Sequence, residues 1–353
     1  MEKKSERYQE KGNLSRRSFL KLSGLLSLGL ASQSILPPAA EAVKFNRRMY
    51  KVSKTQLSMG TFVSMTLIHS SRDKAEEAIS EAFQKIDRLT RSMSRFDETT
   101  AVAQLNREGF LEDVPPEVAE VVSKALGYYR ISHQHFDISV KPIVDLFQHK
   151  FTEGKFTPPH EIELRQALDL VGADKIELKG RTIWFKKPGM GITLDGIAKG
   201  YIVDRASKVL CGHQIKNHLI NAGGDIRAMG SRSDNKAWTV AIQDPEKKRK
   251  YPDIIHLTDA AVATSGNYEV YFDREKILHH IIDPNTGLSP ELNVSVSVIA
   301  KSAMDADALS TSVFVMHPTD ASRFIDSLTG RECFVMAKGG KIFKSAGWKS
   351  AAI

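Results

Sequence analysis

The sequence predicts an α+β fold in which mixed or antiparallel sheets are flanked by helices. Short β-branched or alternating segments dominate from residue 175 onward. Segments with helical periodicity interrupt them at irregular intervals, without the regular strand–helix alternation of a parallel α/β sheet. The 353 residues are enough for two domains, but no linker divides residues 43–353, so we expect one domain there.

The elements follow from local patterns in chain order. Residues 55–68 predict a strand, residues 73–93 and 116–132 predict helices, and the polar segment 148–168, with Pro158-Pro159, predicts a surface loop. The helix at 73–93 has a long apolar face, formed by Ala75, Ala78, Ile79, Ala82, Phe83, Ile86, Leu89 and Met93. Further strands are expected at 183–185, 190–194, 219–221, 238–242, 261–264 and 294–299, and further helices at 196–210, 305–316 and 319–328.

Composition narrows the class of protein. With 41% hydrophobic and 26% charged residues, the chain is neither mainly disordered nor a collagen or coiled coil. The formal charge is +8, of which the first 42 residues contribute +3, so the remainder is only mildly basic and we expect no nucleic-acid partner. Cys211 and Cys333 are too few for a zinc ribbon and leave two alternatives, unpaired thiols or a single disulfide.

The N-terminus has the layout of an export signal. Arg16-Arg17 precedes Ser18-Phe19-Leu20-Lys21, an apolar run spans residues 22–36, and Ala40-Glu41-Ala42 offers a cleavage site. The paired arginines are typical of a twin-arginine signal. We therefore expect residues 1–42 to be a signal peptide and the mature protein, from Val43, to be periplasmic.

A candidate metal site lies in the segment 302–311. Ser302 and Asp305 form a capping pattern, which predicts the start of a helix. Asp307 and Thr311 are four residues apart and would share one face of that helix. A carboxylate and a hydroxyl suit a hard cation such as Mg²⁺, although the same spacing also fits a small-residue helix packed on a sheet.

A second candidate segment follows the strand predicted at 190–194. Asp195-Gly196 lies where a helix would begin, so free backbone N–H groups and Lys199 could receive a phosphate. Gly196 would let the backbone approach a ligand or a metal closely. The segment is neither a G-x-G-x-x-G motif nor a Walker A motif, which argues against the two commonest nucleotide folds.

Two further segments are typical of turns beside a site. Asn221-Ala222-Gly223-Gly224-Asp225 indicates a tight turn or a close backbone approach. His279 and His280 would point to opposite faces of a strand, so one of them could act as a general base. The chain has no G-x-S-x-G elbow and no H-E-x-x-H spacing, so neither a serine hydrolase nor a zinc site is supported.

The order of these segments resembles the ApbE family, the FAD:protein FMN transferases. The resemblance covers roughly residues 52–345. It is carried by Met59-Gly60-Thr61, Met93-Ser94-Arg95-Phe96, Leu105-Asn106, Phe136-Asp137-Ile138-Ser139-Val140, Gly196-Ile197-Ala198-Lys199-Gly200-Tyr201, Asn221-Ala222-Gly223-Gly224-Asp225, Ala263-Thr264-Ser265-Gly266, His280-Ile281-Ile282-Asp283-Pro284 and Asp307-Ala308-Leu309-Ser310-Thr311.

The resemblance implies a Mg²⁺-dependent reaction in which FAD is cleaved, AMP leaves and FMN is joined by a phosphoester bond to Thr or Ser of another protein. The implied acceptor carries an S/T-G-A-T type motif and belongs to a membrane electron-transport complex. Two alternatives stay open. Water could replace the acceptor hydroxyl, which would give an FAD pyrophosphatase, or the chain could bind FAD without catalysis.

The resemblance also implies roles for particular residues. Asp307 and Thr311 match side-chain ligands of Mg²⁺, Gly196 matches a backbone-carbonyl ligand, and Ser310 lies where some members place another ligand. His280 matches a catalytic base or a pyrophosphate contact. The positions implied to contact FAD are Met59, Phe96, His135, Phe136, Asp137, Lys199 and Ile281.

One position departs from the family pattern. The family usually reads Asp-Leu-Gly-Gly where this chain has Thr193-Leu194-Asp195-Gly196. Because residues i and i+2 share a face of a strand, we expect Asp195 either to replace the missing FAD-contacting carboxylate at Thr193 or to leave the site weakened.

Overall fold

The computed structural model describes residues 41–44, 49–152, 155–232, 235–245, 251–268, 279 and 281–351. The predicted signal peptide lies outside the described residues except for Glu41 and Ala42. His280 also lies outside them.

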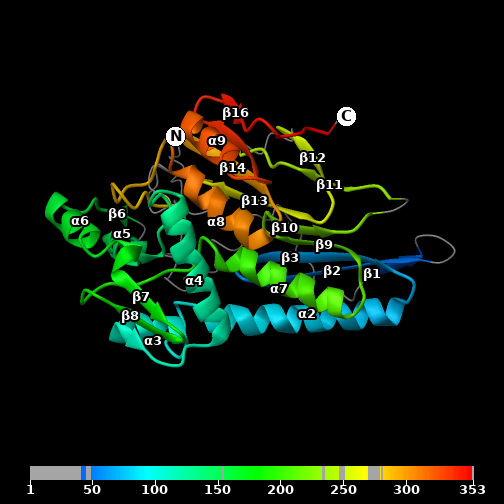
Figure 1. Ribbon diagram of the computed structural model, residues 1–353, viewed down its shortest axis with the longest axis horizontal. Helices are drawn as coiled ribbons and strands as arrows, with labels where there is room; N and C mark the ends of the chain where they lie inside the picture. Colours follow the sequence, from blue (N-terminus) through cyan, green and yellow to red (C-terminus); the bar gives the residue numbers. More distant parts are fainter. Residues whose placement is uncertain are drawn as a thin grey trace, which may run out of the picture.

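A large antiparallel sheet forms the centre of the molecule (Figure 1). Among the described residues it has nine strands in the order β1-β2-β3-β9-β10-β13-β14-β15-β16. Their bounds are Glu41–Lys44, Tyr50–Ser58, Thr61–His69, Asn217–Ala222, Asp225–Met229, Ala260–Gly266, Asn293–Ala300, Glu332–Ala337 and Ile342–Lys344. Antiparallel pairing along this sheet, with helices packed on it, confirms the predicted α+β class.

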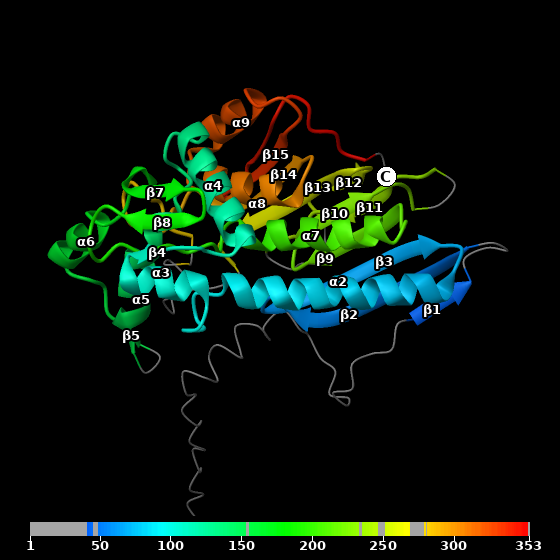
Figure 2. The same ribbon diagram turned by 60° about the horizontal axis from the view of Figure 1, so that its bottom comes forward.

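Three helices, α2 (Arg72–Met93), α7 (Ala198–Gly212) and α8 (Ala303–Phe314), cover one face of this sheet (Figures 1 and 2). The predicted apolar face of α2 is buried at all eight positions. Side chains along β13 alternate between the two faces of the sheet. Ala261 and Ala263 are buried on the face covered by the helices. Val262 lies on the opposite face, where it packs with the paired strands β11 (Trp238–Ala241) and β12 (Ile254–Leu257).

The remaining elements extend the molecule at one end and along the C-terminal strands. A three-stranded sheet of β4 (Phe110–Leu111), β8 (Thr182–Phe185) and β7 (Ile176–Lys179) lies near α3 (Ala101–Glu108) and α4 (Pro116–Ile131). Helix α5 (Lys141–Lys150) packs against α6 (Glu161–Leu168), and α9 (Pro318–Asp326) packs on β15. Short 3-10 turns lie at Ile138–Val140 and Ala173–Lys175, and β5 (Phe151–Thr152) pairs with β6 (Lys155–Phe156).

Three predicted elements are wrong. The single strand expected at 55–68 is a hairpin, because Met59 and Gly60 both have positive φ, at 52° and 71°, and turn the chain between β2 and β3. The loop expected at 148–168 contains the end of α5, the β5–β6 pair and helix α6. Residues 190–194 form no strand: the Asn106 side chain binds both the N–H and the carbonyl of Ile192, at 2.6 and 2.9 Å, in place of a neighbouring strand.

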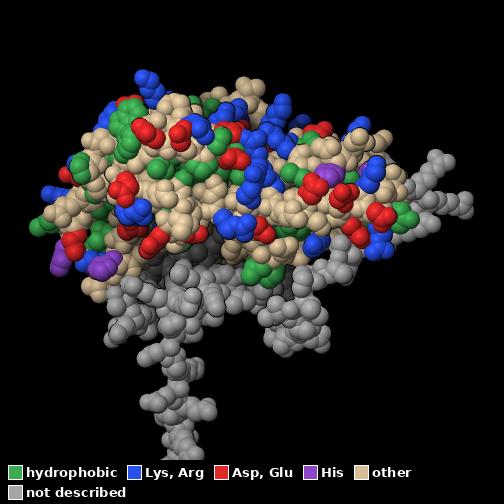
Figure 3. All heavy atoms as spheres, turned by 90° about the horizontal axis from the view of Figure 1, so that it is seen from below, with side chains coloured by type: hydrophobic (Ala, Val, Ile, Leu, Met, Phe, Trp, Pro, Cys, Tyr) green, Lys and Arg blue, Asp and Glu red, His purple; other side chains and the backbone are tan. Residues whose placement is uncertain are grey.

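The surface along α2 carries charges of both signs (Figure 3). Arg72 pairs with Glu76 within the helix, and Lys85 and Arg88 lie near Glu117 of α4. Among the described residues, no helix has the length and apolarity needed to span a membrane. Cys211 is exposed, Cys333 is buried, and neither forms a disulfide.

Candidate active site at the contact of α7 with α8

The candidate site is built on a close crossing of α7 and α8 at Gly200. A Cβ atom on Gly200 would lie only 2.3 Å from the Ala303 carbonyl oxygen, so a larger residue does not fit there. The same approach lets the Gly200 N–H donate to Oδ2 of Asp307 at 2.9 Å. The Asp307 carboxylate, buried at 5% exposure, is thereby fixed toward α7.

Helix α8 is also anchored at its first turn. Both carboxylate oxygens of Asp204 on α7 accept backbone N–H groups, from Ala303 and Met304, each at 2.9 Å. Ser302 accepts from the Asp305 N–H at 3.2 Å, which confirms the predicted capping pattern. Burial raises the pKa of Asp204, and these amides partly offset that effect. The two helices are thus joined by carboxylates of Asp204 and Asp307.

Gly196, Asp307 and Thr311, the three principal ligands predicted for Mg²⁺, come together at this crossing. Asp307 and Thr311 lie one turn apart on α8. A Cβ atom on Gly196 would lie 3.1 Å from both Oγ1 and Cγ2 of Thr311, so the Gly196 backbone occupies space that a side chain would fill. Within the described part of the chain no group of three or more His, Cys, Asp or Glu side chains could hold a metal, whereas this set offers one carboxylate, one hydroxyl and a backbone carbonyl. An all-oxygen donor set of this kind fits Mg²⁺.

The fourth predicted ligand, Ser310, faces β13 instead. Its Oγ donates to the Asp307 carbonyl at 3.0 Å and lies 2.8 Å from Oγ of Ser265. Ser265 Oγ is also 3.5 Å from Thr311 Oγ1. Ser310 is 1% exposed, and these contacts favour a supporting role for it over direct ligation.

Thr193 and Asp195 do not share a face, so that prediction is wrong. Because residues 190–194 form no strand, the chain turns here, and Thr193 Oγ1 accepts from the Asp195 N–H at 3.2 Å. Thr193 is buried, whereas the Asp195 side chain is 58% exposed and lies 3.1 Å from Nε of Arg95. The Asp195 carboxylate therefore does not occupy the position of the Thr193 side chain.

Arg95 connects this turn to Phe96. The Arg95 side chain is only 7% exposed and lies between Asp195 and Asp145, with 3.8 Å to the Asp145 carboxylate. Its guanidinium carbon is 4.2 Å from the centroid of the Phe96 ring. Phe96 is 64% exposed, which leaves ring surface available for stacking on a planar ligand.

The segment His135-Phe136-Asp137 reaches the site through Phe136. The Phe136 ring is buried, lies 3.3 Å from the position of a Cβ on Gly196, and packs edge-to-face against Tyr128. Asp137 instead accepts from the N–H and Oγ of Ser139 and from the Ala173 N–H, at 2.6 to 3.0 Å. Burial raises the pKa of Asp137 to about 6. The Asp137 carboxylate therefore stabilises the local fold. His135 also contacts a residue nearby in the chain, since its Nδ1 lies 2.8 Å from the Ser132 carbonyl oxygen.

Two hairpin turns lie side by side at one end of the sheet. Gly223 has a φ of 60°, and a Cβ there would lie 2.5 Å from Thr61 Oγ1, so the β9–β10 turn packs against the start of β3 beside Met59. Lys199 Nζ is 3.4 Å from the buried Asp225 carboxylate at the start of β10. The tight turn predicted for the paired glycines is confirmed, since both have positive φ, and the close approach holds for Gly223, whereas a Cβ on Gly224 would meet nothing within 4 Å.

The histidine pair is described only in part. His279 is 1% exposed, its Nε2 lies 3.1 Å from the Pro290 carbonyl oxygen, and its ring packs edge-to-face against Phe314. Ile281 is buried, and its N–H points to Nδ1 of His279 at 3.3 Å. His279 is therefore a core residue, while the predicted base, His280, lies outside the described residues.

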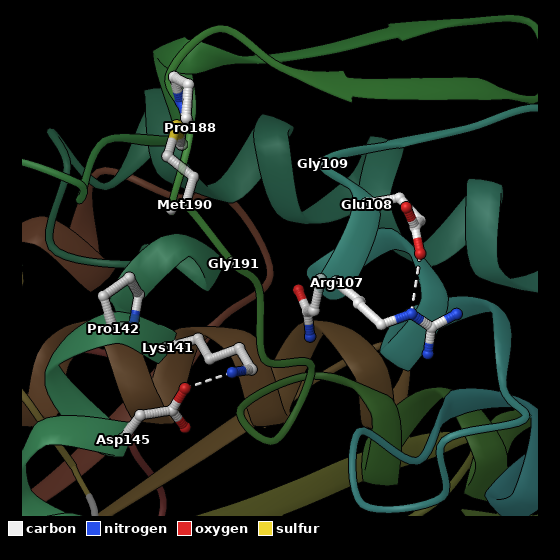
Figure 4. A pocket seen from close by; sticks show the side chains of 11 residues that line it. Arg107, Glu108, Gly109, Lys141, Pro142, Asp145, Pro188, Met190 and Gly191 are labelled. Atoms are coloured by element: carbon white, nitrogen blue, oxygen red, sulfur yellow. Dashed lines mark hydrogen bonds and ion pairs between the residues drawn. The ribbon is translucent and has the colours of Figure 1, made fainter.

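Two cavities lie beside the site. One, of about 250 Å³, is bounded by the end of α3, the start of α5 and residues 188–191. Figure 4 shows Lys141 directed toward Asp145, with which it forms an ion pair. The other, of about 260 Å³, lies at the start of α8 and includes Asp204. Each cavity is lined by a residue that helps to position the site. Asp145, in the first, contacts Arg95, and Asp204, in the second, caps α8.

Sequence reasoning missed four residues that hold the site together: Asn106, Asp204, Ser265 and the guanidinium of Arg95. Three of them stand inside segments that carry the family resemblance, and Asp204 follows such a segment by three residues. No local pattern predicts their partners, which are 45 to 100 positions away in the chain.

Comparison with known proteins agrees with this geometry. The sequence profile of the ApbE family matches residues 59–335. A Vibrio cholerae protein named FAD:protein FMN transferase is 32% identical over 242 residues, covering 66% of this chain and 72% of that protein. A Treponema pallidum protein of the same name is 27% identical and covers 85% of this chain and 88% of its own length. The crystal structure of the ApbE protein from Thermotoga maritima superposes with a TM-score of 0.76 at 29% identity, covering 84% of this chain and 97% of that one. The chain described here therefore belongs to the ApbE family.

Proposed function

We propose that this protein is an FAD:protein FMN transferase. The observation that carries the proposal is the meeting of Gly196, Asp307 and Thr311 at the α7–α8 crossing in a member of the ApbE family. The relatives from Vibrio cholerae and Treponema pallidum are named for that activity.

The Mg²⁺ expected from the resemblance would be held by the Asp307 carboxylate, the Thr311 hydroxyl and the Gly196 carbonyl, with Ser310 behind them. When bound, it would neutralise charge on the pyrophosphate oxygens. The exposed ring of Phe96 is proposed to stack on a planar part of FAD. The other proposed FAD contacts are Met59, His135, Phe136, Asp137, Thr193, Asp195, Lys199 and Ile281. Polar groups of six of them also have partners within the fold, namely His135, Asp137, Thr193, Asp195, Lys199 and the N–H of Ile281.

In the proposed reaction, the oxygen of an acceptor Thr or Ser attacks the phosphorus of the FMN half of FAD. A new P–O bond forms, the bond from that phosphorus to the bridging oxygen breaks, and AMP leaves with the bonding electrons. His280 is proposed as the base that takes the hydroxyl proton. The chain's described residues contribute by orienting FAD and fixing the Asp307 carboxylate.

The setting of the reaction is also a proposal. The paired arginines and the apolar run of residues 1–42 support export by the twin-arginine route to the periplasm. The acceptor would then be an exported domain or membrane subunit of an electron-transfer complex with an S/T-G-A-T type motif.

A direct test uses purified residues 43–353 with FAD, MgCl₂ and an acceptor domain that contains this motif. We expect a fluorescent acceptor band on a denaturing gel and a mass increase equal to covalent FMN, both lost when EDTA is added. Release of AMP and FMN without a labelled band would show an FAD pyrophosphatase instead. Bound FAD without cleavage would show a binding protein.

A further inference from the structure

We infer that Ser265 is a positioning residue that orients the Thr311 hydroxyl toward the proposed metal site. The inference concerns three hydroxyl groups at the contact of β13 with α8, on Ser265, Ser310 and Thr311. It rests on the proposed function only in taking the cation to be bound by Thr311.

Counting protons fixes the direction of these hydrogen bonds. The Asp307 carbonyl can only accept, so Ser310 donates its single hydroxyl proton there, at 3.0 Å. The 2.8 Å contact between Ser310 and Ser265 must then use the proton of Ser265. The Ser265 oxygen is left as an acceptor, and Thr311 Oγ1 is the hydroxyl that faces it, at 3.5 Å.

This order has a consequence for Thr311. A hydroxyl that binds a cation through a lone pair needs an acceptor for its own proton. Ser265 supplies that acceptor, so the Thr311 proton points to β13 and its lone pairs stay available to a cation. Such outer contacts of a metal ligand commonly change metal affinity 10- to 100-fold.

The position of Ser265 on the sheet supports this role. Ser265 has the same strand parity as Ala261 and Ala263, and so lies on the face of β13 covered by α8. Its neighbour Thr264 has the opposite parity, and its hydroxyl pairs with Ser297 Oγ at 2.7 Å on β14. Thr264 therefore offers a matched control, a hydroxyl lost from the same strand without contact with α8.

The test measures Mn²⁺ binding as a stand-in for Mg²⁺, by the electron paramagnetic resonance of free Mn²⁺ in the presence of saturating FAD and no acceptor. The proteins are wild type, Ser265→Ala, Ser265→Thr and Thr264→Val, each with its thermal unfolding midpoint determined. We expect Ser265→Ala to raise the Kd of Mn²⁺ 10- to 100-fold. Ser265→Thr retains the hydroxyl, and Thr264→Val removes one that faces away from α8. For both variants the Kd of Mn²⁺ should stay within about threefold of wild type, well below the change expected for Ser265→Ala.

Two outcomes would overturn the inference while leaving the metal site intact. In the first, Ser265→Ala binds Mn²⁺ as tightly as wild type. In the second, Thr264→Val weakens binding as much as Ser265→Ala does, so that loosening of β13 explains both. Failure of wild type to bind Mn²⁺ at all would instead overturn the proposed metal site, and the role of Ser265 with it.

Discussion

The Asp307 carboxylate has two roles. It accepts the Gly200 N–H and so joins α8 to α7, and it is the only negatively charged group among the proposed metal ligands. Asp307→Asn separates these roles, because an amide oxygen can still accept the Gly200 N–H while the charge is lost. We expect Mg²⁺-dependent FMN transfer to fall by about 10³-fold, the effect of losing several kcal/mol of transition-state stabilisation. Initial rates of acceptor labelling measure this loss. Unchanged rates in a well-folded variant would contradict the assignment of Asp307 to the metal.

Arg95 lies under the ring proposed to stack on FAD and pairs with the turn before Gly196. Arg95→Met keeps much of the buried length of the side chain and removes its charge. We expect the KM for FAD to rise roughly tenfold with a smaller change in kcat, since about 1.4 kcal/mol of ligand positioning is lost. Steady-state kinetics at saturating acceptor check this expectation. As a control, Arg107→Met removes an arginine that is 57% exposed and should leave both constants near wild type.

At the scale of helices, the α7–α8 crossing depends on the absence of a side chain at Gly200. A methyl group there would press on the Ala303 carbonyl, so Gly200→Ala should destabilise the protein by about 2–4 kcal/mol and weaken the site. Gly212→Ala is the matched control at the end of the same helix, because a Cβ there meets nothing within 4 Å. Urea unfolding of both variants gives the comparison. Equal stability of the two variants would show that the crossing can relax.

The same scale shows what local sequence patterns can predict. The apolar spacing of α2 and the Ser302 cap of α8 are local patterns, and each predicts its helix from a short stretch of sequence. The β2–β3 hairpin is missed because a non-glycine residue, Met59, takes positive φ in its turn. For the site, spacing alone pairs Asp307 with Thr311, and the family resemblance adds Gly196; in the structure Gly196 lies against Thr311. The supports of the site depend on tertiary contacts, such as Asn106 binding Ile192, that no short pattern contains.

For the molecule as a whole, a buried histidine links stability to pH. His218 is fully buried on β9; its Nδ1 donates to the Ile215 carbonyl, which leaves Nε2 to accept from Ser207 Oγ. Burial lowers the pKa of His218 from 6.5 to about 4. Between these values the unfolded chain binds a proton that the folded protein does not, so this residue makes stability fall as pH drops.

The corresponding experiment compares urea unfolding of wild type and His218→Gln from pH 7.5 to pH 4.5. The free energy of unfolding of wild type should decline relative to the variant across this range, by roughly 2 to 3 kcal/mol in all. The difference between the two proteins isolates His218 from Asp137, whose pKa is raised to about 6 and which acts in the opposite direction. Parallel curves would show that His218 titrates alike in both states.

The capping of α8 by Asp204 also bears on when the site can form during synthesis. The amides of residues 303 and 304 meet a carboxylate that lies about 100 residues earlier in the chain. Helix α8 packs on β13 and β14, and β15 and β16, which follow α8 in the chain, complete the edge of the sheet. A nascent chain that does not yet extend to residue 311 lacks Thr311, and one that ends before residue 307 lacks Asp307 as well, so no such partial product can assemble the proposed metal site. The proposed export route carries folded proteins. Under that route the site would form in the cytoplasm and cross the membrane already assembled.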